Sequence, residues 1–293
     1  MPSPDVLTIR SFDGAALSLQ RLPLADRPRL ILSHGNGFAM GGYRAFWTLL
    51  AADFDLVLFD LRNHGSSGAT PIEAHTIDAM ANDHVSVAAA CRDAFGARET
   101  FGVFHSVSAI AATLAGQARN IWDGVVLIDP PLVSLDPETG LVCSADDRLA
   151  QYARNRETRF ESVQAYAALI ATGVGRYWVE DAALDMARSV TRAHPGGGVE
   201  LVCPAEYEAQ IYEQNGQTNS YVALGAMKDR VAILGADADA PRALHPARAT
   251  RVAARAFGLP YASVAQTSHM LQVEKPEVAA AALRALLKRL QSG

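Results

Sequence analysis

Cysteine is scarce in this chain of 293 residues, which holds only Cys91, Cys143 and Cys203. No two of them form a CxxC pair, and an odd number of cysteines cannot all pair within one chain. We therefore expect free thiols in a reducing compartment, the cytoplasm, and we expect neither a disulfide framework nor a redox motif.

A strong charge of one sign and long apolar runs are also missing. The formal net charge of -5 gives no reason to expect a nucleic acid or an anionic membrane as partner. No apolar run approaches the ~20 residues that a membrane-spanning helix needs. Arg10, Asp13 and Arg21 interrupt the stretch where a signal peptide would be apolar. The expected partner is a small-molecule substrate, and the sequence leaves the oligomeric state open.

Alternating strand and helix patterns fill most of the chain. A hydrophobic content of 49% with 19% charged residues suits a globular protein with a full core. Eight short apolar runs predict strands, at residues 6–9, 17–22, 29–33, 55–60, 101–104, 124–129, 230–235 and 261–265. Helical patterns lie between most of them, at residues 43–52, 76–95, 109–118 and 245–257, and a last one follows at 278–290. This alternation predicts an α/β fold with a mainly parallel eight-stranded sheet flanked by helices.

Residues 132–228 break the alternation after the sixth strand. Their pattern is mostly helical, with helices expected at 145–156, 162–172 and 179–193, and they hold six of the eight tyrosines. We interpret this segment as a helical cap (lid) over the carboxyl edge of the sheet. The core then consists of residues 1–131 and 229–293.

The stretch FGVFHSVSAI, residues 101–110, carries the candidate nucleophile. A strand pattern ends abruptly at Ser106 and a helical pattern of small residues begins at once. Such a corner exposes the serine Oγ at the carboxyl edge of a parallel sheet, with the N–H of Val107 directed to the same place. The usual nucleophile elbow has glycine two residues before and two after the serine, where this chain has Phe104 and Ser108.

Other polar motifs follow neighbouring strands and are expected at the same edge, where ligands of parallel sheets bind. A serine hydroxyl needs a general base, and His269 can serve, with a carboxylate to orient its imidazole. The developing oxyanion needs two donors. For these we expect the backbone N–H groups of Val107 and Asn36, with Gly37 as the alternative to Asn36.

These motifs together resemble the α/β-hydrolase-fold serine hydrolases. The resemblance rests on HGNGF at 34–38, FDLRNHGSSG at 59–68, HSVSA at 105–109 and SHMLQVEKPE at 268–277. The last is similar to the G-H-x-x-x-x-E-x-P ending of capped esterases, C–C bond hydrolases and haloperoxidase-like members. Ser268 replaces the glycine of that ending, and Asn63 replaces a glycine of the usual R-G-H-G.

The resemblance implies a Ser-His-Asp triad but leaves three candidates for the acid. Family members usually place it a few residues past the glycine that ends the seventh strand, here Gly235, which favours Asp239 and then Asp237. Some relatives place it after the sixth strand, which selects Asp129. Asp129 also suits a structural role, capping the turn before Pro130.

The predicted activity is hydrolysis of a small to medium, mostly apolar ester or related acyl substrate through a Ser106 acyl-enzyme. The aromatic cap suggests the apolar substrate, for which we expect contacts from Phe38, His105, Trp178 and Met270. The histidines show no metal-ligand spacing, so neither a metal nor another cofactor is expected. Alternatives are a C–C bond hydrolase, lactonase or acyltransferase with the same triad, or a non-catalytic protein that binds a small molecule.

Overall fold

The computed structural model describes residues 4–141, 147–241 and 243–292. Its large sheet has eight strands: β1 (Asp5–Arg10), β2 (Ala16–Leu22), β3 (Arg29–Ser33), β4 (Asp55–Phe59), β5 (Thr100–His105), β6 (Gly124–Ile128), β10 (Val231–Gly235) and β11 (Tyr261–Ser263). Their order is β1-β2-β4-β3-β5-β6-β10-β11. The pairs β1–β2 and β2–β4 are antiparallel, and every other pair is parallel. The predicted α/β class with a mainly parallel eight-stranded sheet is confirmed.

Helices cover both faces of this sheet, which is why its central strands are apolar throughout. Every residue of β3, β4, β6 and β10 is buried. Along β3, Leu30 and Leu32 enter one core cluster and Ile31 enters the other, as the alternation of strand side chains requires.

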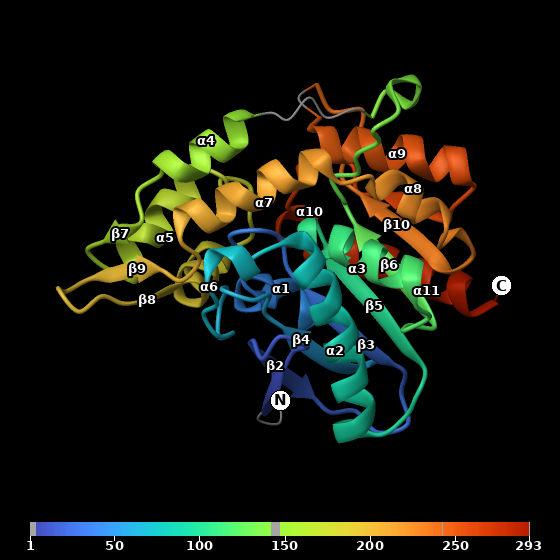
Figure 1. The fold of residues 1–293 in the computed structure, drawn as a ribbon, viewed down its shortest axis with the longest axis horizontal. Helices are drawn as coiled ribbons and strands as arrows, with labels where there is room; N and C mark the ends of the chain where they lie inside the picture. The colour runs from blue at the N-terminus through green and yellow to red at the C-terminus, as the bar shows by residue number, and fades with distance from the viewer. Residues whose placement is uncertain (1–3, 142–146, 242, 293) are drawn as a thin grey trace.

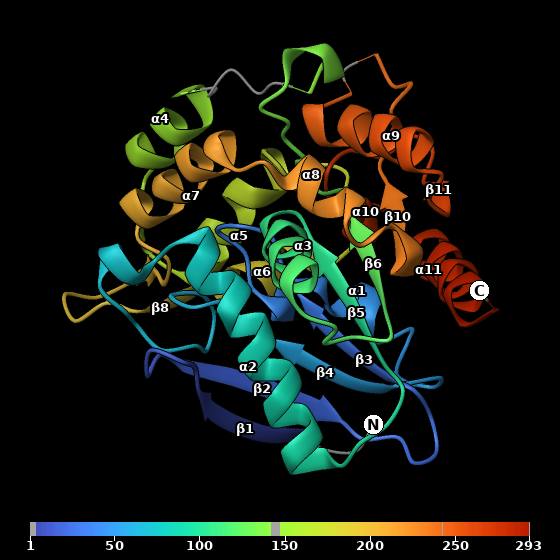
Figure 2. The ribbon, with the colours of Figure 1, turned by 45° about the vertical axis from the view of Figure 1, so that its right-hand side comes forward.

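The helices divide between the two faces as follows. The helices α2 (Ile77–Phe95), α3 (Val107–Ala118) and α9 (His245–Phe257) contribute to the cluster of Ile31. The helices α1 (Arg44–Trp47), α10 (Leu271–Glu274) and α11 (Pro276–Ser292) contribute to the cluster of the other face. Figure 2 shows α2 and α3 crossing the near face.

The chain between β6 and β10 holds a further group of elements, most of which lie to the left in Figure 1. It comprises α4 (Asp147–Asn155), α5 (Val163–Thr172), α6 (Ala182–Val190), α7 (Ala205–Gln217) and α8 (Ser220–Gly225), with strands β7 (Arg159–Phe160), β8 (Thr191–Ala193) and β9 (Val199–Leu201). These strands make a small sheet in the order β7-β9-β8. The predicted helix 179–193 is too long, because its last three residues pair as β8. Strands of two or three residues are too short to show a period of two in the sequence.

The segment 132–228 is not uniform in what it packs against. Its last helix, α8, packs on α3, and Leu224 and Met227 belong to a core cluster of the large sheet. A Cβ on Gly116 of α3 would lie 2.3 Å from the Met227 Cε, so the contact is close. The segment that extends away from the large sheet therefore ends before α8.

The predicted helix 43–52 forms only in part. Met40–Tyr43 is a 3-10 helix, α1 covers Arg44–Trp47, and turns follow. The helix α6 packs on this segment so closely that a Cβ on Gly42 would lie 2.9 Å from the Met186 Cα. Glycine at 42 therefore permits a backbone approach that a side chain would block. Within residues 4–141, 147–241 and 243–292, no helix is long and apolar enough to cross a membrane.

Candidate active site

Ser106 occupies a strained corner between β5 and α3. Its φ of +57° and ψ of -124° lie outside the regions that L-residues usually adopt. The corner is held by the Ser106 N–H, which donates to the Ile128 carbonyl at 3.0 Å, and by the Ser106 carbonyl, which accepts from Ala109 and Ile110. A Cβ on Gly35 would lie 3.0 Å from the Ser106 Cβ, so the glycine loop must pass Ser106 without a side chain there.

Phe104 and Ser108, which stand where the usual nucleophile elbow has glycines, are each accommodated by their neighbours. The Phe104 ring is fully buried and packs edge-on against Phe59 and His84. It covers Gly102, where a Cβ would lie 2.3 Å from the Phe104 Cε2, so the glycine that makes room stands two residues earlier. Ser108 is buried, and its Oγ lies 3.1 Å from the His84 Nε2.

Three side chains that are distant in sequence form a continuous relay at the carboxyl edge. The His269 Nε2 lies 2.9 Å from the Ser106 Oγ, and the His269 Nδ1 lies 2.8 Å from the Asp129 Oδ2. Because a carboxylate only accepts, the Nδ1 carries the ring proton and the Nε2 is free to accept from the serine hydroxyl. The second carboxylate oxygen of Asp129 accepts from the Ala236 N–H at 3.0 Å. Asp129 is fully buried, and these two hydrogen bonds hold its carboxylate in a fixed place.

The preference for Asp239 as the acid partner of His269 is wrong in this geometry. The Asp239 side chain is 84% exposed and forms an ion pair with Arg251. The alternative Asp237 accepts from the N–H groups of Asp239 at 2.9 Å and Gln266 at 2.7 Å. Asp237 thus braces the loop that leads to His269, and these backbone bonds lower its carboxyl pKa. Asp129, the third candidate, is the one that contacts the imidazole.

Two backbone N–H groups beside Ser106 are available as donors. In the part of the chain that the structure describes, neither the Asn36 N–H nor the Val107 N–H has a hydrogen-bond acceptor. The Gly37 N–H, by contrast, donates to the His64 Nε2 at 3.0 Å. This bond counts against Gly37, the alternative donor, and leaves Asn36 and Val107.

Buried neutral histidines hold the glycine loop from behind. The His34 Nδ1 lies 2.8 Å from the Gly35 carbonyl, and the His34 Nε2 accepts from the Leu61 N–H at 3.0 Å. Burial lowers the pKa of His34 to about 4 and that of His64 to about 3. Both rings are therefore uncharged at neutral pH and act as fixed hydrogen-bonding groups.

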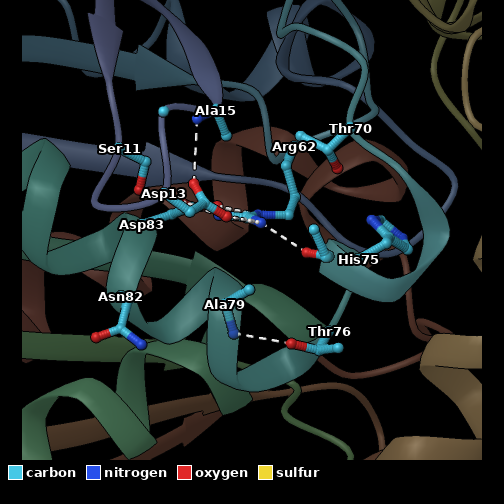
Figure 3. Close-up of polar contacts among 12 residues, drawn as sticks. Ser11, Asp13, Ala15, Arg62, Thr70, His75, Thr76, Ala79, Asn82 and Asp83 are labelled. Atoms are coloured by element: carbon cyan, nitrogen blue, oxygen red, sulfur yellow. Dashed lines mark hydrogen bonds and ion pairs between the residues drawn. The ribbon is translucent and has the colours of Figure 1, made fainter.

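The loop after β4, which carries His64, is anchored through Arg62 (Figure 3). The Arg62 guanidinium forms two hydrogen bonds of 2.7 Å with the buried Asp83 of α2 and one of 2.8 Å with Asp13. It also donates to the Ala74 carbonyl at 2.6 Å. The segment after β4, the turn after β1 and the helix α2 are thus joined by one cation.

The helix α7 contacts the glycine loop through Glu208. The Asn36 Nδ2 donates to the Glu208 carbonyl at 2.8 Å. The Glu208 carboxylate lies against Gly37, where a Cβ would approach its Cδ to 2.8 Å. This carboxylate is paired with Arg156, and its burial raises its pKa. The Arg156 Nε is buried and has no hydrogen-bond partner among the described residues.

The four residues expected to contact substrate differ in position. Phe38 and Trp178 meet edge-on with ring centroids 6.2 Å apart, and Met270, next to His269, is buried. His105 is 2% exposed, and both its ring nitrogens contact protein atoms, the Tyr43 hydroxyl and the His269 carbonyl. His105 therefore offers no free polar atom to a substrate.

The site is nearly closed in this structure, since Ser106 is 9% exposed. Two cavities lie elsewhere, at the amino ends of the strands. One of about 390 Å³ is lined by residues 26–28 and 97–99, and one of about 310 Å³ is lined by Arg29, Arg92 and Trp122 among others. Neither includes a member of the relay.

Among the residues that the structure describes, one cluster of three side chains could in principle hold a metal ion. His64, His75 and Cys203 are buried, with ligand atoms within 4.8 Å of one another. The His64 Nε2 already accepts from Gly37, and the His75 Nδ1 accepts from the Asn63 amide at 2.9 Å, which leaves the proton on the His75 Nε2. Because neither ring presents an unused lone pair, we assign no metal to this cluster. Cys91 and Cys203 are free and buried, and Cys143 lies outside the described residues.

Comparison with known proteins identifies the family to which this chain belongs. Residues 30–282 match the model of the alpha/beta hydrolase family, and the chain therefore belongs to that family. No curated protein matches the chain in sequence.

Solved structures of the same fold cover nearly the whole chain. E-2-(acetamidomethylene)succinate hydrolase is 19% identical, with a TM-score of 0.78, over 97% of this chain and 100% of that one. An esterase from a Rhodococcus species is 20% identical, with a TM-score of 0.73, over 97% and 99%. N-formylmaleamic acid deformylase from Pseudomonas putida is 14% identical, with a TM-score of 0.66, over 96% and 100%. At these identities the likeness concerns the fold.

Proposed function

We propose that this protein is a serine hydrolase that cleaves an ester or related acyl substrate through a Ser106 acyl-enzyme. The observation that carries the proposal is the unbroken relay from the Ser106 Oγ to the His269 imidazole and on to Asp129, with contacts of 2.9 and 2.8 Å. Membership in the alpha/beta hydrolase family supports it.

In the first step, the Ser106 Oγ attacks the substrate carbonyl carbon while its proton passes to the His269 Nε2. Asp129 stabilises the resulting imidazolium through the Nδ1 hydrogen bond. The N–H groups of Asn36 and Val107 stabilise the negative charge on the former carbonyl oxygen, and a single donor of this kind contributes about 3 kcal/mol. His269 then gives its proton to the leaving group, and the acyl group remains on Ser106.

In the second step, a water molecule takes the place of the leaving group. His269 accepts a proton from this water, the hydroxide attacks the acyl carbon, and the same two N–H groups stabilise the second oxyanion. The proton then returns to the Ser106 Oγ as the acid product leaves. An acceptor other than water would make the same site an acyltransferase.

The substrate is proposed to be small to medium in size and mostly apolar, since Phe38 and Trp178 lie together on the cap side. A second candidate is amide hydrolysis of a substrate that carries a carboxylate. Arg156 favours it, because its guanidinium pairs with the Glu208 carboxylate that lies against Gly37 while its Nε has no hydrogen-bond partner among the described residues. Two similar structures are named for compounds with an amide and carboxyl groups, which adds support.

The test is active-site labelling combined with turnover. A fluorophosphonate probe is expected to label the protein once, at Ser106, as located by peptide mass spectrometry. Ser106→Ala is expected to abolish labelling and to lower kcat for p-nitrophenyl esters by at least about 10⁴-fold. Ser108→Ala, which changes a buried neighbouring serine, is the matched control and should keep labelling and turnover.

Undiminished turnover in Ser106→Ala would contradict the proposal. Absence of labelling together with tight binding of a small molecule would favour a non-catalytic binding protein. A panel of esters of graded acyl length, lactones, β-diketones and N-acyl amides with and without carboxylates then separates the candidate reactions.

A further inference from the structure

A second histidine, His105, lies beside the proposed general base. The ring centroids of His105 and His269 are 4.6 Å apart. The His105 Nε2 lies 3.0 Å from the His269 carbonyl oxygen, and the His105 Nδ1 lies 2.8 Å from the Tyr43 hydroxyl. The Tyr43 hydroxyl in turn accepts from the Gly35 N–H at 3.2 Å. The relay of Ser106, His269 and Asp129 uses none of these bonds.

The partners of this chain allow one arrangement of protons. A carbonyl oxygen only accepts, so the His105 Nε2 carries the ring proton. The Nδ1 must then accept, so the Tyr43 hydroxyl donates to it and uses its own oxygen to accept from Gly35. Every donor has an acceptor, and the chain runs in one direction from the Gly35 N–H to the His269 carbonyl.

Burial keeps this arrangement uncharged. Both residues are 2% exposed. Burial raises the pKa of Tyr43, which therefore stays protonated. Burial and the neighbouring His269 hold the pKa of His105 well below 6.5. A neutral His105 places no second positive charge beside the imidazolium that forms during the reaction.

The chain joins two parts of the site that are far apart in sequence. Gly35 directly precedes Asn36, which carries a proposed oxyanion donor. His269 is the proposed base, and its loop is also held by Asp237 through the Gln266 N–H and by Glu274 through the Ser268 N–H. His105 directly precedes Ser106, so the hydrogen bonds converge on the residue next to the nucleophile.

We propose that His105 is a positioning residue that acts with Tyr43 to fix the distance between the general base and the oxyanion donor. This inference rests on the proposed function. Displacement of a reacting group by about 1 Å is sufficient to slow catalysis about 100-fold. The effect is expected in kcat, because the alignment of base and donor matters in the transition state and not in ground-state binding.

The experiment compares four variants with p-nitrophenyl esters. His105→Leu removes both hydrogen bonds and is expected to lower kcat about 100-fold with KM within about threefold. His105→Gln keeps an N–H donor for the His269 carbonyl and should recover part of that loss. Tyr43→Phe should lower kcat by about tenfold, and the double variant should lose no more than His105→Leu alone, because both act through one chain.

His84→Leu is the matched control. His84 is 1% exposed, and its nitrogens contact the Met80 carbonyl and Ser108, outside this chain. Its replacement should lower the melting temperature about as much as His105→Leu does while kcat stays within about threefold of wild type.

The outcomes separate this inference from the proposed function. If Ser106→Ala keeps full turnover, the proposed function fails. If Ser106→Ala is inactive but His105→Leu lowers kcat no more than His84→Leu, or if the effects of His105→Leu and Tyr43→Phe simply add, the positioning role is overturned. If His105→Leu does not fold, the His105→Gln and Tyr43→Phe pair decides by the same criterion of kcat loss at unchanged KM.

Discussion

Two residues of the relay share an unusual backbone conformation. Ser106 has a φ of +57° and Asp129 a φ of +43°, and each directly follows one of two neighbouring parallel strands, β5 and β6. A positive φ is uncommon for residues other than glycine, and it turns each side chain out of the strand direction at the carboxyl edge. The Asp129 carboxylate can thus accept from His269 on one oxygen and from Ala236 on the other.

Asp129→Asn is expected to lower kcat by about 10⁴-fold, since an amide in this place favours the wrong imidazole tautomer. Asp239→Asn, on the exposed Arg251 pair, should leave kcat within about twofold because surface pairs contribute little. Ester turnover at saturating substrate measures both. Equal losses, or a larger loss in Asp239→Asn, would contradict the assignment of Asp129.

The sequence could supply Ser106 and His269 but could not choose among the three aspartates. All three follow strands whose carboxyl ends meet at one edge, so the pattern alone treats them alike. The choice depends on where each loop carries its carboxylate. Asp237 accepts a hydrogen bond from the Gln266 N–H, and Asp239 forms an ion pair with Arg251. Neither interaction can be inferred from the sequence.

At the scale of elements, the segment after β4 depends on a single buried cation. Arg62 is fully buried, and its charge is compensated by Asp83 of α2 and by Asp13 of the turn after β1 (Figure 3). A buried charge that loses its partner is strongly unfavourable. The same segment carries His64, which accepts the Gly37 N–H, so its position affects the glycine loop.

Asp83→Leu should therefore lower the free energy of unfolding by about 3–5 kcal/mol, because it leaves the Arg62 guanidinium without its bidentate partner. Urea denaturation followed by circular dichroism measures the change. Asp13→Asn is the control, since its side chain is 25% exposed and the neutral amide can still accept a hydrogen bond; it should lose less than Asp83→Leu. Equal losses would show that burial does not decide the effect.

Most of the large elements could be predicted from sequence, but the helix α7 (Ala205–Gln217) and the small elements are not among those predicted. Strands such as β3 and β10 are continuous apolar runs because both their faces are covered. The elements β7 to β9 and α1 are too short to repeat a period, and α8 packs on α3 through Leu224 and Met227 with no signal that separates it from the cap helices. Tertiary contacts, not local pattern, define these elements.

For the whole molecule, buried neutral histidines dominate the dependence of stability on pH. Burial holds the pKa well below 6.5 in five of them: His34, His64, His75, His84 and His105. In the unfolded chain these rings take up protons near pH ~6.5, whereas in the folded state His34 and His84 do so only near pH 4, and His64 and His75 only near pH 3. Buried carboxyls such as Asp60, whose pKa is raised, act in the opposite direction but are fewer.

The free energy of unfolding should consequently fall as pH decreases below about 6.5, because the unfolded chain then binds more protons than the folded state. Above pH ~6.5 this contribution is constant. Urea titrations at several pH values give the slope of the free energy of unfolding against pH. His84→Leu should reduce this slope by the contribution of about one proton. Stability that is independent of pH in this range would contradict the neutral, buried state of these rings.

The contact between α7 and the glycine loop bears on the order of events in turnover. Ser106 is nearly inaccessible, and the Asn36 side chain donates to the Glu208 carbonyl of α7. We expect this helix to withdraw when a ligand enters, which would release Asn36, the proposed oxyanion donor. The donor would regain its place when the helix returns over the bound molecule. We therefore expect recognition by induced fit, in which compounds that do not permit closure enter but react slowly.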